Sequence, residues 1–159
     1  MDNLSATLSR SLIYSFQDYN NSVQDLSQTL TEAQFWHNPY SYGNSFGHLV
    51  LHLTGNLNHF IGTHIADTGY VRQRELEFTD PNHYPKQETL LRLQEAVDMV
   101  VVTLEGQDSS SWTAPYAVGN IKDTRLDAFL RTLAHFHHHL GQMIYLVREL
   151  SASKYGELT

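Results

Sequence analysis

The stretch that decides the fold is TRLDAFLRTLAHFHHHLGQMIYLVRELS, residues 124–151. Thr124 and Asp127 at its start have the spacing of a capping box, in which each side chain binds the other residue's backbone N–H. The apolar residues that follow recur at intervals typical of one face of an α-helix. They are Leu126, Leu130, Leu133, Leu140, Ile144 and Val147. The sequence therefore predicts a helix that starts after Thr124 and ends near Ser151.

Three earlier segments show the same periodicity, and each predicts another long helix. They are residues 4–28, residues 45–68 with Gly69 as a C-terminal cap, and residues 86–105 with Gly106 as a stop signal. A second capping-box pattern, Thr31 and Gln34, predicts a brief helical turn before the loop at residues 37–44.

The segments between the later helices are long and lack a helical period. Residues 70–85 mix charges with two prolines, and residues 107–122 contain three consecutive serines and the pair Gly119-Asn120, which is typical of a short hairpin. Four amphipathic helices with long second and third connections predict an all-α fold, a four-helix bundle.

Composition limits the possible functions. The chain has 159 residues, which predicts a single domain over residues 1–159. The formal net charge of −7 disfavours a groove that neutralises nucleic-acid phosphates, so we expect no nucleic-acid partner. The absence of cysteine excludes disulfides, thiolate nucleophiles and cysteine-ligated metal sites. No stretch has the roughly 18 apolar residues of a membrane span, so we expect no membrane partner and a cytoplasmic location.

Histidine is the unusual residue, because its ten copies equal Lys and Arg combined. His48 and His52 are four residues apart on one predicted helix, and His135 and His139 are four apart on the last one. This spacing points two imidazoles the same way, so that they can bind one ion. A third imidazole from a neighbouring helix would complete a three-nitrogen site. The alternative is that these histidines only cap hydrogen-bond networks.

The other histidines favour less specific roles. On a helical wheel His59 shares the edge of His48 and His52, whereas His138 lies on the polar face and His137 leans toward the apolar side. His37, His64 and His83 are isolated or lie in predicted loops.

Two segments resemble the signatures of a known group. LHLTGN at residues 51–56 and HFHHHLGQMIYL at residues 135–146 are similar to segments of the DinB/YfiT-like superfamily of bacterial metal-binding four-helix bundles. Carried over residue by residue, the resemblance implies the metal ligands His52, His135 and His139, with His48 as a rival to His52. Arg74, Glu75 and Phe78 loosely resemble a further segment of an uncharacterised branch.

The resemblance also implies a function. It implies a divalent metal ion such as nickel, zinc or iron, a homodimer, and a transferase that uses a small-molecule, low-molecular-weight thiol such as bacillithiol or mycothiol. Because the chain has no cysteine, the nucleophilic sulfur would arrive with this cosubstrate. The alternatives are a non-catalytic metal-binding or stress-associated dimer and a helical module without metal.

Residues around the expected ligands add further hypotheses. Arg72 and Arg74 are candidates to steer a carboxylate-bearing thiol, and Asn56, Gln142 and Tyr145 to orient ligands or water. Hydrolysis is disfavoured, because the nearest acidic residues, Glu75, Glu77 and Asp80, fall in a connection that we expect to be mobile.

Overall fold

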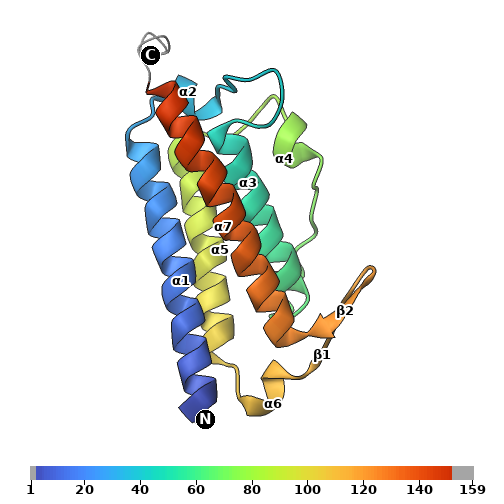
Figure 1. Cartoon of the computed structure of the whole chain (residues 1–159). Coiled ribbons are helices and arrows are strands. Elements are labelled where there is room, and N and C mark those ends of the chain that lie inside the picture. The colour runs from blue at the N-terminus through green and yellow to red at the C-terminus, as the bar shows by residue number, and fades with distance from the viewer. Residues whose placement is uncertain (1–2, 152–159) are drawn as a thin grey trace.

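The computed structural model describes residues 3–151, and its long helices stand side by side as a bundle (Figure 1). They are α1 (Asn3–Gln28), α3 (Phe46–Leu57) continued by the π-helical segment η1 (Asn58–Thr63), α5 (Lys86–Glu105) and α7 (Arg125–Leu150). The connections contain α2 (Glu32–Trp36), α4 (Leu76–Thr79), α6 (Ser109–Trp112) and a hairpin of β1 (Pro115–Val118) and β2 (Ile121–Thr124). The prediction of an all-α four-helix bundle is confirmed.

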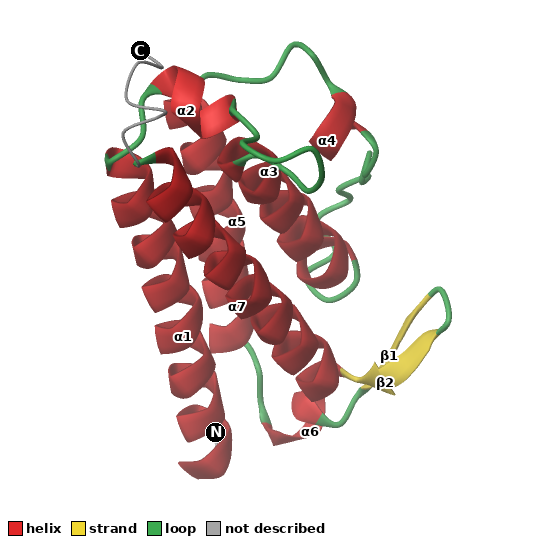
Figure 2. Cartoon of the chain, turned by 45° about the horizontal axis from the view of Figure 1, so that its top comes forward, coloured by secondary structure: helices red, strands yellow, loops and turns green. Residues whose placement is uncertain are grey.

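The directions of the helices decide the paths of the connections. Helices α1 and α3 each pack against both α5 and α7, so α1 and α3 lie diagonally across the bundle. Helices α1 and α7 run one way, and α3 and α5 run the other way (Figure 1). Because α3 and α5 are parallel, residues 64–85 must return along the length of the bundle. This return carries α4 along the outer side of α3, as Figure 2 shows.

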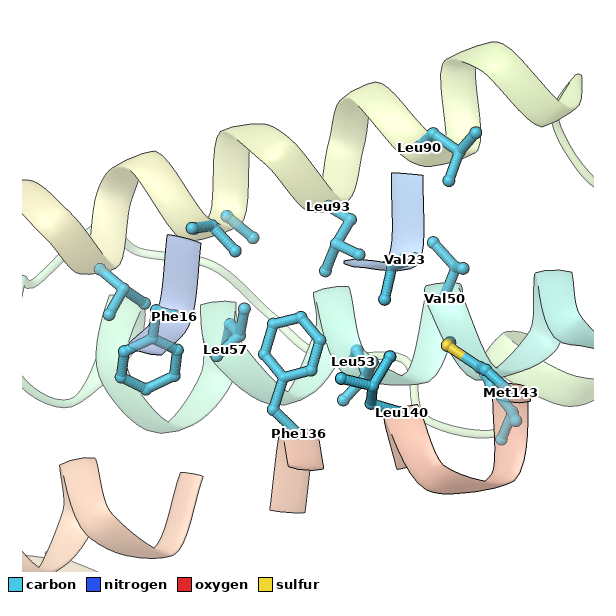
Figure 3. Packing of buried hydrophobic residues seen from close by; sticks show 14 of the residues in the cluster. Phe16, Val23, Val50, Leu53, Leu57, Leu90, Leu93, Phe136, Leu140 and Met143 are labelled. Atoms are coloured by element: carbon cyan, nitrogen blue, oxygen red, sulfur yellow. The ribbon is translucent and has the colours of Figure 1, made fainter. Parts of the chain in front are cut away.

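The core lies where the four long helices meet (Figure 3). Each helix contributes side chains that are fully or almost fully buried, among them Phe16, Leu53, Leu93 and Phe136. Burying a side chain of this size contributes about 1.5–3 kcal/mol to the free energy of unfolding. The helical spacing predicted this face in α1, α3 and α5, but in α7 the prediction was partly wrong, because Leu130 is 48% exposed and Phe136 and Met143 are buried instead. The packed core fixes the relative positions of α3 and α7.

The two predicted capping boxes are present, and a third cap was not predicted. Thr31 and Thr124 form capping boxes with Gln34 and Asp127. Ser45 caps α3, where its hydroxyl oxygen accepts a hydrogen bond from the backbone N–H of His48 at 3.2 Å. These caps fix the first turns of the helices, whose leading N–H groups have no partner within the helix.

We expect Thr124→Ala to lower the free energy of unfolding by about 1 kcal/mol, the usual value for a lost N-terminal cap. The hydroxyl of Thr124 accepts from the backbone N–H of Asp127 and donates to its carboxylate, and alanine removes both bonds. Denaturant titration measures the change. Lys122→Ala, an exposed position on the adjacent strand, is the control and should leave stability unchanged. An equal loss in both variants would contradict the assigned cap.

The second long helix differs from the prediction. It ends at Thr63 rather than near Thr68, and after Leu57 it continues as a π-helix with wider turns. Gly69 does have a left-handed backbone conformation, with φ of +72°, but it lies beyond the helix end and is not its cap. Within residues 3–151, no helix is long and apolar enough to cross a lipid bilayer.

Candidate metal centre

Three histidines from two helices converge at one point of the bundle. His52 lies on α3, and His135 and His139 lie one turn apart on α7. Each ring offers a nitrogen, and these three nitrogens all lie within 4.8 Å of one another. His52 is buried, while His135 and His139 are half-buried. In the described part of the chain, this is the one group of histidine and acidic side chains with such a geometry.

The distances between the rings fit a shared divalent ion. The Nε2 atoms of His52 and His135 are 3.0 Å apart. Two imidazole nitrogens bound to one ion at about 2.0–2.1 Å, with an angle near 90–110° between them, lie roughly 3.0–3.4 Å apart. The ring centroids of His52 and His139 are 4.9 Å apart, and those of His135 and His139 are 4.4 Å apart. The three side chains are therefore close enough to bind a metal ion.

The outer nitrogens of two of these rings have acceptors that select the tautomer. His52 Nδ1 lies 2.8 Å from a carboxylate oxygen of Glu77, and His139 Nδ1 lies 2.7 Å from the side-chain oxygen of Gln142. An oxygen acceptor at Nδ1 places the ring proton there. The Nε2 lone pair of each ring is then free on the opposite side. A metal-binding histidine requires this arrangement.

Burial keeps two of the imidazoles neutral. The pKa of His135 is lowered to about 4, first by burial and then by the neighbouring His139 and His52. Burial also lowers the pKa of His139, and this effect outweighs the hydrogen bond that His139 donates to Gln142, which acts in the opposite direction. Both rings are therefore unprotonated at pH 7, the state in which imidazole binds metals.

A buried ion pair supports His52 from behind. The carboxylate of Glu77 accepts from Arg72 Nε at 2.6 Å and from Arg72 Nη2 at 2.9 Å, in addition to its contact with His52. Only 8% of the Glu77 side chain and 10% of the Arg72 side chain are exposed. Burial raises the pKa of Glu77, but the hydrogen bonds from His52 and Arg72 outweigh it and hold the pKa below its usual value. Glu77 is therefore an anion that fixes the orientation of His52.

Gly55 makes room for this ion pair. It lies on α3, one turn after His52 on the side facing residues 64–85, and a Cβ at this position would overlap the Glu77 carboxylate. Phe78 on α4 packs against the ring of His52, and the two ring centroids are 5.1 Å apart. The guanidinium of Arg74 lies over the Phe78 ring at 5.9 Å.

These contacts correct two of our hypotheses. We expected Glu77 to lie in a mobile connection away from the ligands, and we expected Arg72 to be available for a substrate. Instead, Arg72 and Glu77 bind each other beneath His52. The spacing of residues within each helix could not reveal this contact, because it depends on the return path of residues 64–85. The only sign of this ion pair in the sequence was that Arg72 and Glu77 are five residues apart.

Gln142 contacts one of the expected ligands, as its candidate orienting role requires. It lies on α7 within hydrogen-bond distance of His139, and its side chain is exposed. Tyr145 is 70% exposed and Asn56 makes no contact with the three rings that would orient them.

We expect Gln142→Ala to lower metal affinity by about tenfold, the lower end of the range for partners of metal-bound histidines. Alanine removes the acceptor that holds the Nδ1 proton of His139. Gln142→Glu keeps an oxygen acceptor and should retain the affinity. Competition with a chromophoric zinc chelator measures both variants. Equal affinities for alanine and glutamate would show that this contact does not matter.

The other histidines lie apart from this group. Nδ1 of His48 lies 2.9 Å from Ser45 Oγ, and its ring contacts Trp36, which also stacks on His83. The structure therefore places His52, and not His48, beside His135. His59 contacts His64, with ring centroids 4.9 Å apart.

The two remaining histidines of α7, His137 and His138, are exposed. His138 is exposed, as predicted. His137 is also exposed, with its ring against Tyr19, so the prediction that it leans toward the core is wrong.

Comparisons with known proteins give the family and the fold of this chain. The family described as "Protein of unknown function (DUF1572)" matches residues 3–159. No curated protein matches the chain. The fold is similar to that of a DinB-like protein, YjoA, from Bacillus subtilis, with a TM-score of 0.67, 17% identity, and coverage of 94% of this chain and 96% of that one.

A second solved structure has the same fold. It is a DinB-like protein from Bacillus cereus ATCC 10987, with a TM-score of 0.70 and 13% identity, and the similarity covers 88% of this chain and 91% of that one. The resemblance to DinB-like proteins is confirmed at the level of the fold.

Proposed function

The chain belongs to the DUF1572 family, whose description states no function, and we propose from the site itself that it is a divalent-metal-dependent enzyme. The proposed ligands are His52, His135 and His139. The observation that carries the proposal is the convergence of their three ring nitrogens within 4.8 Å. Three imidazole ligands suit nickel, zinc or iron, and a set of three protein ligands leaves coordination positions open to exchange, as catalytic sites require.

The proposed reaction is the transfer of a low-molecular-weight thiol, of the bacillithiol or mycothiol type, to a small electrophile. A bound divalent ion would supply one thing, a lower pKa for an acid that it coordinates. The chain contains no cysteine, so the sulfur nucleophile has to come from the cosubstrate. This supports a transferase in which the protein itself stays chemically unchanged.

The chain's own residues position the ligands. Glu77 and Arg72 hold His52, and Gln142 holds His139. Glu77 is a poor general base for hydrolysis, because its carboxylate is bound by Arg72 and faces the Nδ1 side of His52, away from the shared point. We therefore prefer thiol transfer to hydrolysis.

Metal analysis and a thiol assay test the proposal in sequence. The protein must be purified without a histidine tag, because His137 and His138 are exposed and a tag would add adventitious sites. After loading with zinc, nickel or iron and exhaustive dialysis, we expect about one ion per chain. Loaded protein should then consume thiol in the presence of electrophiles such as a chlorodinitroarene. Less than a few tenths of an equivalent of metal would contradict the proposal.

A non-catalytic metal-binding protein is the alternative outcome of this assay. It would retain one ion per chain but consume no thiol with any pair of reactants tested. We also propose a homodimer. Light scattering should then give about twice the chain mass of 18.2 kDa, and a monomer would contradict this part of the proposal.

A further inference from the structure

A cavity of about 230 Å³ adjoins the candidate metal centre. His135 forms part of its wall, and the rest comes from α3, η1, β1 and α7. The other lining residues are Asn56, Phe60, Tyr116, Ala128, Arg131 and Thr132. None of these six residues is a proposed metal ligand. The cavity is therefore a separate feature beside the histidines.

Asn56 is the unusual residue of this wall. Its side chain is only 7% exposed, and within residues 3–151 it makes no hydrogen bond. The fully buried side-chain atoms without a partner in this part of the chain are Asn20 Oδ1 and Gln107 Oε1, so the Asn56 amide, which is not among them, is still accessible. Asn56 borders a cavity in which a bound molecule could supply the missing bonds. Its amide is therefore placed to bind a ligand.

The remaining wall defines the rest of that ligand. Phe60, Ala128 and the ring of Tyr116 provide apolar surface, and the Tyr116 hydroxyl is already bound to the carbonyl oxygen of Phe60 at 2.9 Å. Arg131 is the one charged residue of the wall, and no carboxylate lines the cavity. Arg131 is paired with Asp123, but a guanidinium has five N–H donors, which leaves some for a second anion. The charge of the wall thus favours an anion over a cation.

The volume limits the size of the ligand. An apolar cavity of about 150 Å³ holds one benzene molecule, and drug-sized ligands occupy roughly 300–1,000 Å³. About 230 Å³ has room for one ring or a short branched chain with one polar group.

We propose that this cavity is a binding site for a small carboxylate with an apolar body, whose carboxylate accepts a hydrogen bond from the Asn56 amide. Arg131 provides the favourable charge, and Phe60, Ala128 and Tyr116 contact the body. That the cavity is a substrate site rests on the proposed function, because His135 belongs both to the cavity wall and to the proposed metal centre. The cavity itself can be tested with or without metal.

Benzoate is the probe for the test. We expect it to bind saturably to the full chain, in metal-free and in zinc-loaded samples, and to shift the side-chain amide signal of Asn56 and the methyl signal of Ala128 in NMR spectra. Benzylammonium, of similar size but opposite charge, should bind at least about tenfold more weakly. Absence of saturable benzoate binding, or shifts confined to another surface, would overturn the proposal.

Variants distinguish a ligand contact from a structural role. Asn56→Ala should weaken benzoate binding about tenfold, the effect of one hydrogen bond to a charged group, while the melting temperature stays unchanged because the amide has no partner to lose. Asn58→Ala is the matched control, since its amide bonds to Thr54 and it does not line this cavity. Equal benzoate affinity in Asn56→Ala and wild-type protein would overturn the proposal.

A second variant approaches the cavity from the opposite helix. Ala128→Leu adds volume from α7 and should abolish benzoate binding even if Asn56→Ala does not fold. Zinc content is measured in every sample. Benzoate binding without zinc binding would count against the proposed metal centre alone, and zinc binding without benzoate binding would count against this inference alone.

Discussion

Replacing His52, His135 or His139 by alanine is expected to lower the affinity for zinc by roughly 100-fold or more, beyond the 10–100-fold effect of partners that only orient metal ligands. Each variant removes one of three converging nitrogens. A site with two remaining imidazoles no longer holds the ion tightly. Isothermal titration with a competing chelator measures the affinity, and circular dichroism checks the fold.

The controls for this prediction are histidines that the structure places elsewhere. His138→Ala removes an exposed ring beside His139, and His48→Ala removes the rival of His52 on the same helix. Both variants should bind zinc like the wild-type protein. Loss of zinc on His48→Ala together with retention on His52→Ala would overturn the ligand assignment.

The second large effect is expected at Glu77. Glu77→Gln should lower the free energy of unfolding by about 3–5 kcal/mol, because breaking a buried ion pair leaves the partner charge uncompensated. That partner is the guanidinium of Arg72, whose side chain is 10% exposed. The variant should also bind zinc about 10–100-fold more weakly, since His52 loses its anionic acceptor. Denaturant titration and chelator competition measure the two effects.

Glu75→Gln is the matched control for this prediction. Glu75 precedes the same short helix α4 but is exposed, so its replacement should change stability by less than about 0.5 kcal/mol. A double variant, Arg72→Met with Glu77→Gln, should lose less stability than the sum of the single variants, because it removes the orphaned charge. Strict additivity, or a loss at Glu77 no larger than at Glu75, would contradict the buried pair.

The sequence predicted the bundle because local signals and the final structure agree. The apolar spacing of residues 124–151 and the capping box at Thr124 define α7 almost to its last residue. The bounds of the helix over residues 86–105 are the same in sequence and structure. These features depend on neighbours within a few residues, and their physical causes can be read locally.

The candidate site was only partly predictable. The four-residue spacing of His135 and His139 placed both rings on one face of a helix, but their convergence with His52 depends on how α3 packs against α7. His48 and His52 are four residues apart on the same edge of one helix, so the spacing could not choose between them. The choice of His52 came from the resemblance. In the structure, Ser45 binds the ring of His48, whereas His52 reaches α7 and lies beside His135.

The remaining features depend on the tertiary path of the chain. Glu77 and Arg72 reach His52 because parallel α3 and α5 require a return along the bundle. The cavity beside Asn56 combines residues of four elements, and no local pattern in the sequence could indicate it.

The most direct test is a crystal structure of the tag-free protein loaded with zinc, with anomalous data collected on both sides of the zinc absorption edge. A strong anomalous peak is predicted about 2.0–2.1 Å from one nitrogen of each of His52, His135 and His139. The proposed metal centre would be contradicted by an anomalous peak at His137 or His138 instead. It would also be contradicted if His52 and His135 were bonded directly to each other with no anomalous peak between them.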